Sequence, residues 1–145
     1  MSQQLRSIWL KIDKKVQSLT CEDHEINQIF SWIEDQNDLL MYISDILAIK
    51  NLSPKIKDVL TQSLLNQAYL PVVVNSLVVM KQKKDVQKLC LNSSIYLLIQ
   101  TFKILKETAP NFLKIITAAL FSKDSLPDYL MDKIQDCEFK NDRSE

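Results

Sequence analysis

The chain has 145 residues, of which 46% are apolar and 25% are charged, and its 18 basic residues equal its 18 acidic ones. This is the balance of an ordinary globular domain, long enough to bury a real core. A net charge of zero argues against a general nucleic-acid-binding protein, because such proteins need a basic excess to displace counterions. We therefore expect no nucleic-acid partner.

Glycine is absent from the chain, although roughly ten would occur at its usual frequency. Tight β-hairpins, phosphate-binding loops and nucleophile elbows all depend on glycine for positive φ or for close backbone approach. The composition therefore predicts an all-α fold made of helices joined by polar or proline-containing links.

Apolar residues recur at helical spacing along most of the chain. The spacing predicts helices over about 5–19, 23–49, 55–67, 71–80, 89–106, 111–121 and 125–136. The polar stretch 34–38 is expected to bend or split the second of these helices. Six to seven helices with short links predict an armadillo- or HEAT-like helical array or an irregular bundle.

Prolines mark the expected helix starts. Ser53 and Pro54 are a good N-cap and first-turn pair, and Pro71 and Pro110 each suggest a new beginning. The valines after Pro71 favour a strand, but no partner strand is visible, so a helix is the better prediction. We find no domain boundary and expect one helical domain, or a segment of a larger helical-repeat scaffold, over 1–137, with a frayed tail over 138–145.

The cysteines and the hydropathy pattern point to the cytoplasm. Cys21, Cys90 and Cys137 are odd in number and widely spaced, so they do not form a disulfide framework and a reducing compartment is expected. The N-terminus has no signal-peptide pattern. The longest apolar run, 70–80, is too short to span a bilayer.

No constellation for catalysis is complete. The only histidine, His24, lies three residues after Cys21, but structural zinc needs four ligands, so an exposed histidine near a helix start is the better interpretation. A nucleophilic cysteine or serine would need an oriented base and an oxyanion hole, and neither has a signature here. We expect no enzyme, no metal, no cofactor and no small-molecule substrate. Thiol chemistry at one cysteine is kept as an alternative.

The connector over 81–88 carries Lys81, Lys83, Lys84 and Lys88. A solvated loop is the plain interpretation of these lysines. Contact with anionic lipid headgroups is the alternative.

Aromatic residues lie among apolar neighbours and are expected in the core or in grooves. They include Trp9, Trp32, Tyr42, Tyr69, Tyr96 and Tyr129. The most apolar helix, over 89–106, contains Leu97 and Leu98, and a charge at either position should unfold the chain.

Several ordered blocks in the middle of the chain resemble a known family. They are YISDIL at 42–47, DVLTQSLLN at 58–66, AYLPVVVNSL at 68–77, SIYLLIQTF at 94–102 and AP at 109–110. In order and spacing they resemble an internal helical segment, over roughly 34–124, of the C-type lectin domain family sixteen member A family. Relatives in that family are called endosomal maturation defective and transparent testa nine.

The resemblance implies a cytoplasmic scaffold, peripheral on endosomal and lysosomal membranes, that acts in vesicle trafficking and in autophagy, including mitophagy. The partners it implies are trafficking or tethering factors, Rab-type GTPases and ubiquitin-ligase components. Ligase activity itself is not carried over, because the chain has no RING-like spacing of cysteine and histidine. Family members are several times longer, so an inner or C-terminal stretch of a larger scaffold is expected. The alternatives are a generic helical-repeat adaptor of an unrelated pathway and a non-catalytic component of a ubiquitin-ligase assembly.

Overall fold

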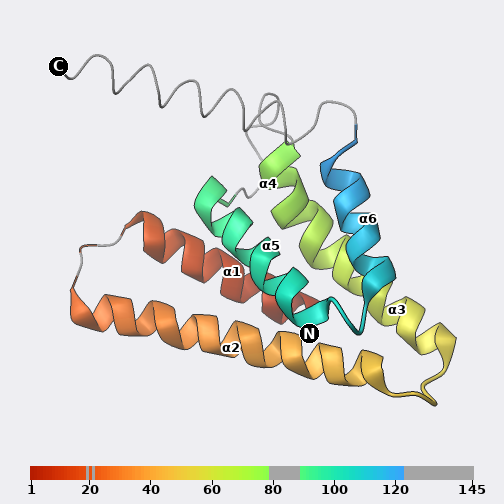
Figure 1. The fold of residues 1–145 in the computed structure, drawn as a ribbon. Helices are drawn as coiled ribbons and strands as arrows, with labels where there is room; N and C mark the ends of the chain where they lie inside the picture. Colours follow the sequence, from red (N-terminus) through yellow and green to blue (C-terminus); the bar gives the residue numbers. More distant parts are fainter. Residues whose placement is uncertain (19, 21, 79–88, 123–145) are drawn as a thin grey trace.

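The computed structural model describes residues 1–18, 20, 22–78 and 89–122, and these residues are helical apart from short links (Figure 1). The helices are α1 (Ser2–Gln17), α2 (Asp23–Ala48), α3 (Pro54–Leu64), the π-helix η1 (Leu65–Val74), α4 (Asn75–Val78), α5 (Leu91–Leu105) and α6 (Pro110–Leu120). The described residues contain no strand, which confirms the all-α prediction. The helix predicted over 125–136 and the tail over 138–145 lie outside the described residues.

The helix start predicted at Pro71 is wrong, because α3, η1 and α4 form one continuous rod and Pro71 lies inside it. Proline lacks an N–H, and in an α-helix its ring conflicts with the carbonyl four residues earlier. The wider π turn relieves this conflict. The Asn75 N–H at the end of η1 points to the carbonyls of Leu70 and Val72. The described residues therefore hold five continuous helical runs, and the predicted count of six to seven is not confirmed.

The other helix boundaries follow the sequence signals more closely. Pro54 and Pro110 each occupy the first turn of a helix, as predicted. The 26-residue α2 continues through 34–38 without a break. Glutamate and glutamine are good helix formers, and the buried Gln36 lies on the same face as Leu40 and Ile43.

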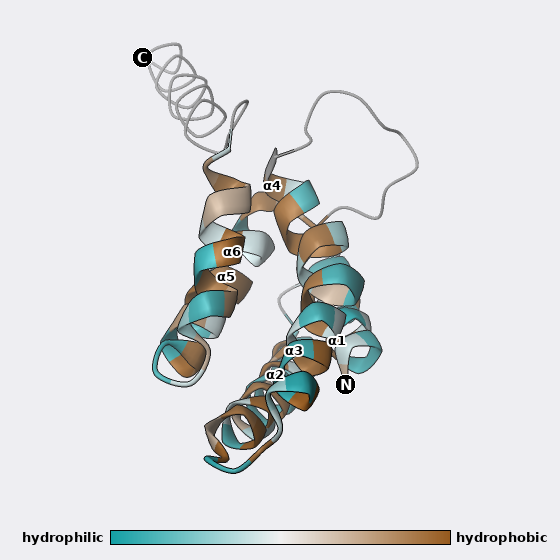
Figure 2. Cartoon of the chain, turned by 90° about the vertical axis from the view of Figure 1, so that its right-hand side faces the viewer, coloured by the Kyte–Doolittle hydropathy of each residue, from teal (hydrophilic) through white to brown (hydrophobic). Residues whose placement is uncertain are grey.

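The helices pack as an irregular bundle around the central rod. α1 and α2 run antiparallel side by side, α1 passes behind α5, and in this view the rod runs between α5 and α6 (Figure 1). Seen from the side, α5 and α6 form one layer, while α1, α2 and α3 lie in the other (Figure 2). α5 contacts α1, α2, η1, α4 and α6. Stacked repeats contact only their neighbours in the series, so the armadillo- or HEAT-like repeat is not confirmed.

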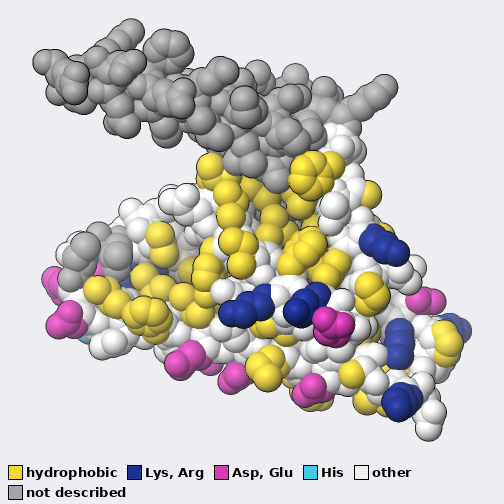
Figure 3. Space-filling view, viewed as in Figure 1, with side chains coloured by type: hydrophobic (Ala, Val, Ile, Leu, Met, Phe, Trp, Pro, Cys, Tyr) yellow, Lys and Arg dark blue, Asp and Glu magenta, His cyan; other side chains and the backbone are white. Residues whose placement is uncertain are grey.

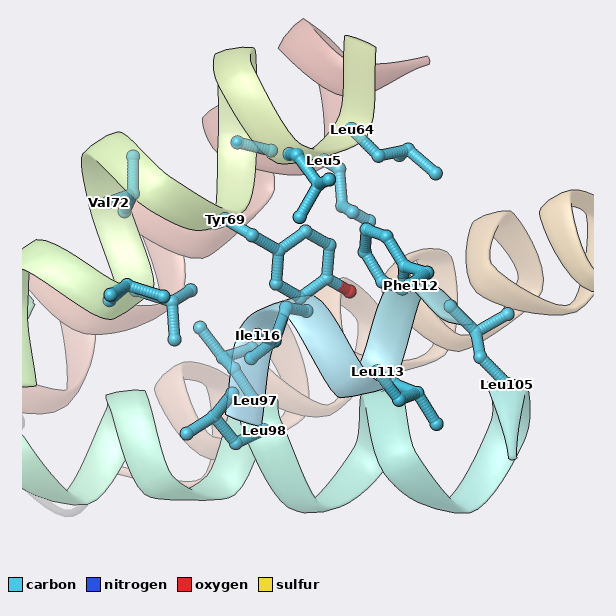
Figure 4. Packing of buried hydrophobic residues seen from close by; sticks show 14 of the residues in the cluster. Leu5, Leu64, Tyr69, Val72, Leu97, Leu98, Leu105, Phe112, Leu113 and Ile116 are labelled. Atoms are coloured by element: carbon cyan, nitrogen blue, oxygen red, sulfur yellow. The ribbon is translucent and has the colours of Figure 1, made fainter. Parts of the chain in front are cut away.

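Tyr69 of η1 occupies the centre of the core (Figure 4). Its ring meets Trp9 and Phe112 edge to face, with ring centroids 5.0 and 5.1 Å apart. Its hydroxyl lies 2.7 Å from Thr101 Oγ1, and the Thr101 hydroxyl itself donates to the Leu97 carbonyl at 2.7 Å. Tyr69 must therefore be the donor to Thr101. Burial raises the pKa of Tyr69, so the phenol stays protonated and can donate.

Two buried side chains bind the backbone of Leu89 and Cys90, just before α5 begins. The Asp13 carboxylate of α1 accepts the Cys90 N–H at 2.8 Å and the Gln17 side-chain amide at 2.6 Å. The Ser76 hydroxyl of α4 accepts the Leu89 N–H at 2.8 Å. Since buried backbone donors need acceptors, these contacts fix the start of α5 to both α1 and α4.

A third polar contact closes the link between α1 and α2. The Glu25 carboxylate pairs with Lys15 and accepts both the N–H and the hydroxyl of Thr20, at 2.9 and 2.7 Å. Hydrogen bonds from Lys15 and then from Thr20 lower the pKa of Glu25 to about 2. The two helices are thus joined by a carboxylate that stays ionised at neutral pH.

Candidate interaction surfaces

Lys81, Lys83, Lys84 and Lys88 lie outside the described residues, so their contact with anionic lipid stays a prediction. The structure does place the residues that follow them, because Leu89 is buried. Within the described ranges, no helix combines the length and the apolarity needed to cross a bilayer.

The predicted cysteine and histidine positions are only partly described, because Cys21 and Cys137 lie outside the described residues. Cys90 is a half-buried free thiol at the N-cap of α5, and its sulfur accepts the Ser93 N–H at 3.4 Å. His24 is exposed and lies 3.2 Å from Glu22. In the described part of the chain, no three or more His, Cys, Asp or Glu residues gather as a metal site would require. The contacts of Cys90 assign it a capping role.

An apolar groove of about 460 Å³ lies between the start of α1, the end of α2 and α3. Its lining side chains are all uncharged, and they belong to Met1, Ser2, Gln3, Ile46, Ile56, Val59, Leu60, Ser63 and Gln67. Ile56 and Val59 are 52% and 61% exposed. Of the α3 residues, Leu64 alone is fully buried, so α3 turns apolar side chains to solvent. We call this surface the α3 groove.

The outer face of α2 forms a second surface, which we call the α2 ridge. Its exposed residues are Phe30, Glu34, Asp38, Met41, Tyr42 and Asp45, together with Ile49 at the C-terminal cap of the helix. The opposite face of α2 is fixed by the core, where Leu40, Ile43 and Leu47 are buried. Helical periodicity then leaves the ridge residues pointing outward. Helical spacing from Ile26, Ile29 and Ile33 predicts that Phe30 joins the apolar inner face, and this prediction is wrong, because its side chain is 59% exposed.

The α2 ridge is acidic, and α2 itself supplies no lysine or arginine to offset its acids. The acids of α2 are Asp23, Glu25, Glu34, Asp35, Asp38 and Asp45. Among the described residues, Glu25 is the one α2 acid in an ion pair with a basic side chain. In the view of Figure 3, acidic side chains follow the lower edge along α2, and basic ones gather above and to the right. Lys11 and Lys103 line the grooves beside these acids, but among the described residues neither forms an ion pair with Asp38 or Asp45.

Open grooves flank the ridge on both sides. The groove toward α1 has a volume of about 510 Å³ and includes Asp35, Asp38 and Tyr42. The groove toward α5 has a volume of about 430 Å³ and includes Met41 and Asp45. The ridge could have been found from the sequence by counting charges along each helix, because six acids with no lysine or arginine on one helix is a strong imbalance.

The sequence profile of the CLEC16A helical domain matches residues 27–138. No curated protein and no solved structure matches the chain. The matched span covers most of the chain, from α2 through α6 and beyond, and it contains all the sequence blocks that carried the resemblance. The chain therefore belongs to the family of the CLEC16A helical domain.

Proposed function

We propose that this protein is a non-catalytic interaction scaffold in endosomal and lysosomal membrane trafficking and in autophagy, including mitophagy. The observation that carries the proposal is membership of the CLEC16A helical domain family over residues 27–138. Its partners are trafficking or tethering factors and Rab-type GTPases, and it works as a peripheral protein on endosomal and lysosomal membranes.

The geometry supports a binding role in a simple way. The core around Tyr69 is buried, while Ile56 and Val59 stay exposed in the α3 groove, which is lined by uncharged side chains. Apolar side chains gathered on one exposed surface are typical of protein-binding sites. The α3 groove is therefore the first surface at which to expect a trafficking partner.

The test follows the intact tagged protein in cells. Proximity labelling should enrich endosomal and lysosomal proteins, and loss of the protein should slow cargo degradation. The double variant Ile56→Glu, Val59→Glu should fold normally, because both positions are exposed, yet it should lose part of the labelled set. A matched control is Lys55→Glu, at an exposed position on the same helix that does not line the groove. A diffuse signal with normal cargo degradation would refute the trafficking role.

The lipid contact of Lys83 and Lys84 has its own test. Replacing both with glutamate should preserve folding and weaken binding to vesicles that contain phosphatidylserine, because each surface lysine contributes about 1 kcal/mol to such binding. Unchanged vesicle binding would remove the lipid contact from the proposal and leave the scaffold role in place.

The second candidate is a non-catalytic component of a ubiquitin-ligase assembly, which the same family resemblance implies. Labelling dominated by ligase subunits, with normal cargo degradation, would favour it. Labelling spread over proteins of an unrelated pathway would instead favour a generic helical adaptor.

A further inference from the structure

The α2 ridge holds large apolar side chains away from the core. Phe30, Met41, Tyr42 and Ile49 are 59%, 57%, 58% and 49% exposed. Single exposed apolar residues are common, but Phe30, Met41 and Tyr42 lie along one face of α2, and Ile49 caps the end of the same helix. From Phe30 to Asp45 the face extends about 22 Å at the usual rise per residue. Such a face has the length of a helix-binding surface.

Acidic side chains lie between these apolar ones. Glu34 and Asp38 are four residues apart, so their charges repel one another on the helix surface. Asp45 continues the same row. Within the described ranges, none of the three has a lysine or arginine within ion-pair distance. A positively charged partner would relieve the repulsion while covering the apolar residues.

We propose that the α2 ridge binds a basic amphipathic helix of a partner protein, one with lysines or arginines beside a row of apolar side chains. This inference rests on the proposed scaffold function and names the partner chemistry of one surface. The apolar residues supply the contact area, and the acids select a basic partner and speed its encounter. A continuous helix of 26 residues offers a long surface to such a partner.

The negative charge of the α2 ridge disfavours a second copy of the chain, an anionic membrane and a nucleic acid as its binding partner. A symmetric pair of chains joined through this surface would place the acids of both copies against one another. Anionic membranes and nucleic acids would be repelled by the same row of carboxylates. The ridge therefore fits a basic protein segment better than a second copy, a lipid surface or RNA.

The expected size of the charge effect can be worked out. An exposed ion pair contributes about 0.2–1 kcal/mol, so removing Glu34, Asp38 and Asp45 together should weaken binding about tenfold, since each factor of ten corresponds to about 1.4 kcal/mol. The effect should shrink at high salt, because surface charges are screened beyond about 10 Å at 0.1 M ionic strength.

The experiment uses the full chain and a fluorescent 18-residue helical peptide of leucine and lysine, with binding followed by anisotropy at low and high salt. One control peptide has glutamate in place of lysine, and another has the same composition in an order that is not amphipathic. The triple variant Glu34→Gln, Asp38→Asn, Asp45→Asn is compared with Asp58→Asn, Glu107→Gln, which removes exposed acids elsewhere. Circular dichroism confirms that both variants stay folded.

The proposal expects the leucine–lysine peptide to bind the wild-type chain, the triple variant to weaken it about tenfold, and the control variant to stay within about twofold. A second variant, Met41→Ser, should weaken binding without changing the salt dependence. Equal binding of the scrambled peptide, or no loss in the triple variant, would overturn the proposal. So would a dimer in sedimentation that the triple variant abolishes, because a second copy would then occupy the ridge. Peptide binding retained by a protein that fails the cellular test would overturn the trafficking role alone.

Discussion

Removing either hydroxyl of the buried Tyr69–Thr101 pair should destabilise the protein, but by different amounts. Tyr69 donates to Thr101, and Thr101 donates to the carbonyl of Leu97. In Tyr69→Phe, Thr101 keeps its bond to that carbonyl and no buried donor is left without an acceptor. In Thr101→Val, the Tyr69 hydroxyl stays buried and loses its acceptor. The second change should therefore destabilise the protein more than the first, although both remove one hydroxyl group.

The magnitudes follow from the cost of unmade hydrogen bonds. Tyr69→Phe should lower the free energy of unfolding by about 0.5–1.5 kcal/mol, the net value of an ordinary hydrogen bond. Thr101→Val should lower it by about 1–3 kcal/mol, because a buried donor keeps its full desolvation penalty. The double variant should cost less than the sum of the two, since removing both groups leaves no unpaired donor.

Urea unfolding, followed by circular dichroism and tryptophan fluorescence, measures these differences. Tyr42→Phe is the matched control, because Tyr42 is 58% exposed, and it should change the stability by less than about 0.5 kcal/mol. A larger loss for Tyr69→Phe than for Thr101→Val would refute the assigned donor direction. Strict additivity in the double variant would refute the coupling.

Three further predictions concern the rest of the bundle. The folded-state pKa of Glu25, about 2, lies below its ordinary value of 4.5. The stabilisation that the ionised carboxylate provides is therefore present above about pH 4.5 and is lost as the pH falls toward 2. The urea midpoint of Glu25→Gln should decline less over this pH range than that of the wild type. Leu97→Asp, at a position 1% exposed, should unfold the chain with a cost on the order of 4 kcal/mol or more, while Ile99→Asp, at 57% exposure, should leave the circular dichroism spectrum intact. Asp13→Ala should remove the acceptor of the Cys90 N–H, and hydrogen exchange should then speed up at the start of α5 while changing little in α6.

Much of the orientation of α2 can be predicted from the sequence, and the predictions that were wrong have clear physical causes. Helical spacing pairs Gln36 with Leu40 and Ile43, and the structure buries all three. The composition of 34–38 does not predict the burial of Gln36, because an average over a window ignores which side of the helix each residue faces. The exposed position of Phe30 could not be read in the same way, since an apolar residue at the edge of a helical face is covered only if a neighbouring helix reaches it.

Local sequence decided that the chain is helical and where several helices begin. Without glycine, hairpins and phosphate loops are hard to build, and a proline in the first turn sets a helix start wherever its missing N–H has no cost. These are short-range effects that act within a few residues. They explain why the boundaries at Pro54 and Pro110 followed from the sequence.

The tertiary structure decided what happens at Pro71 and which faces stay open. Proline alone favours a break, but Tyr69 and Val72 on either side of it are fully buried. Packing against α1, α5 and α6 therefore favours a continuous rod with a widened turn over a broken one. The exposure of the α3 groove and the α2 ridge is decided in the same way, because it depends on which helices lie beside them, and those contacts join residues far apart in the chain.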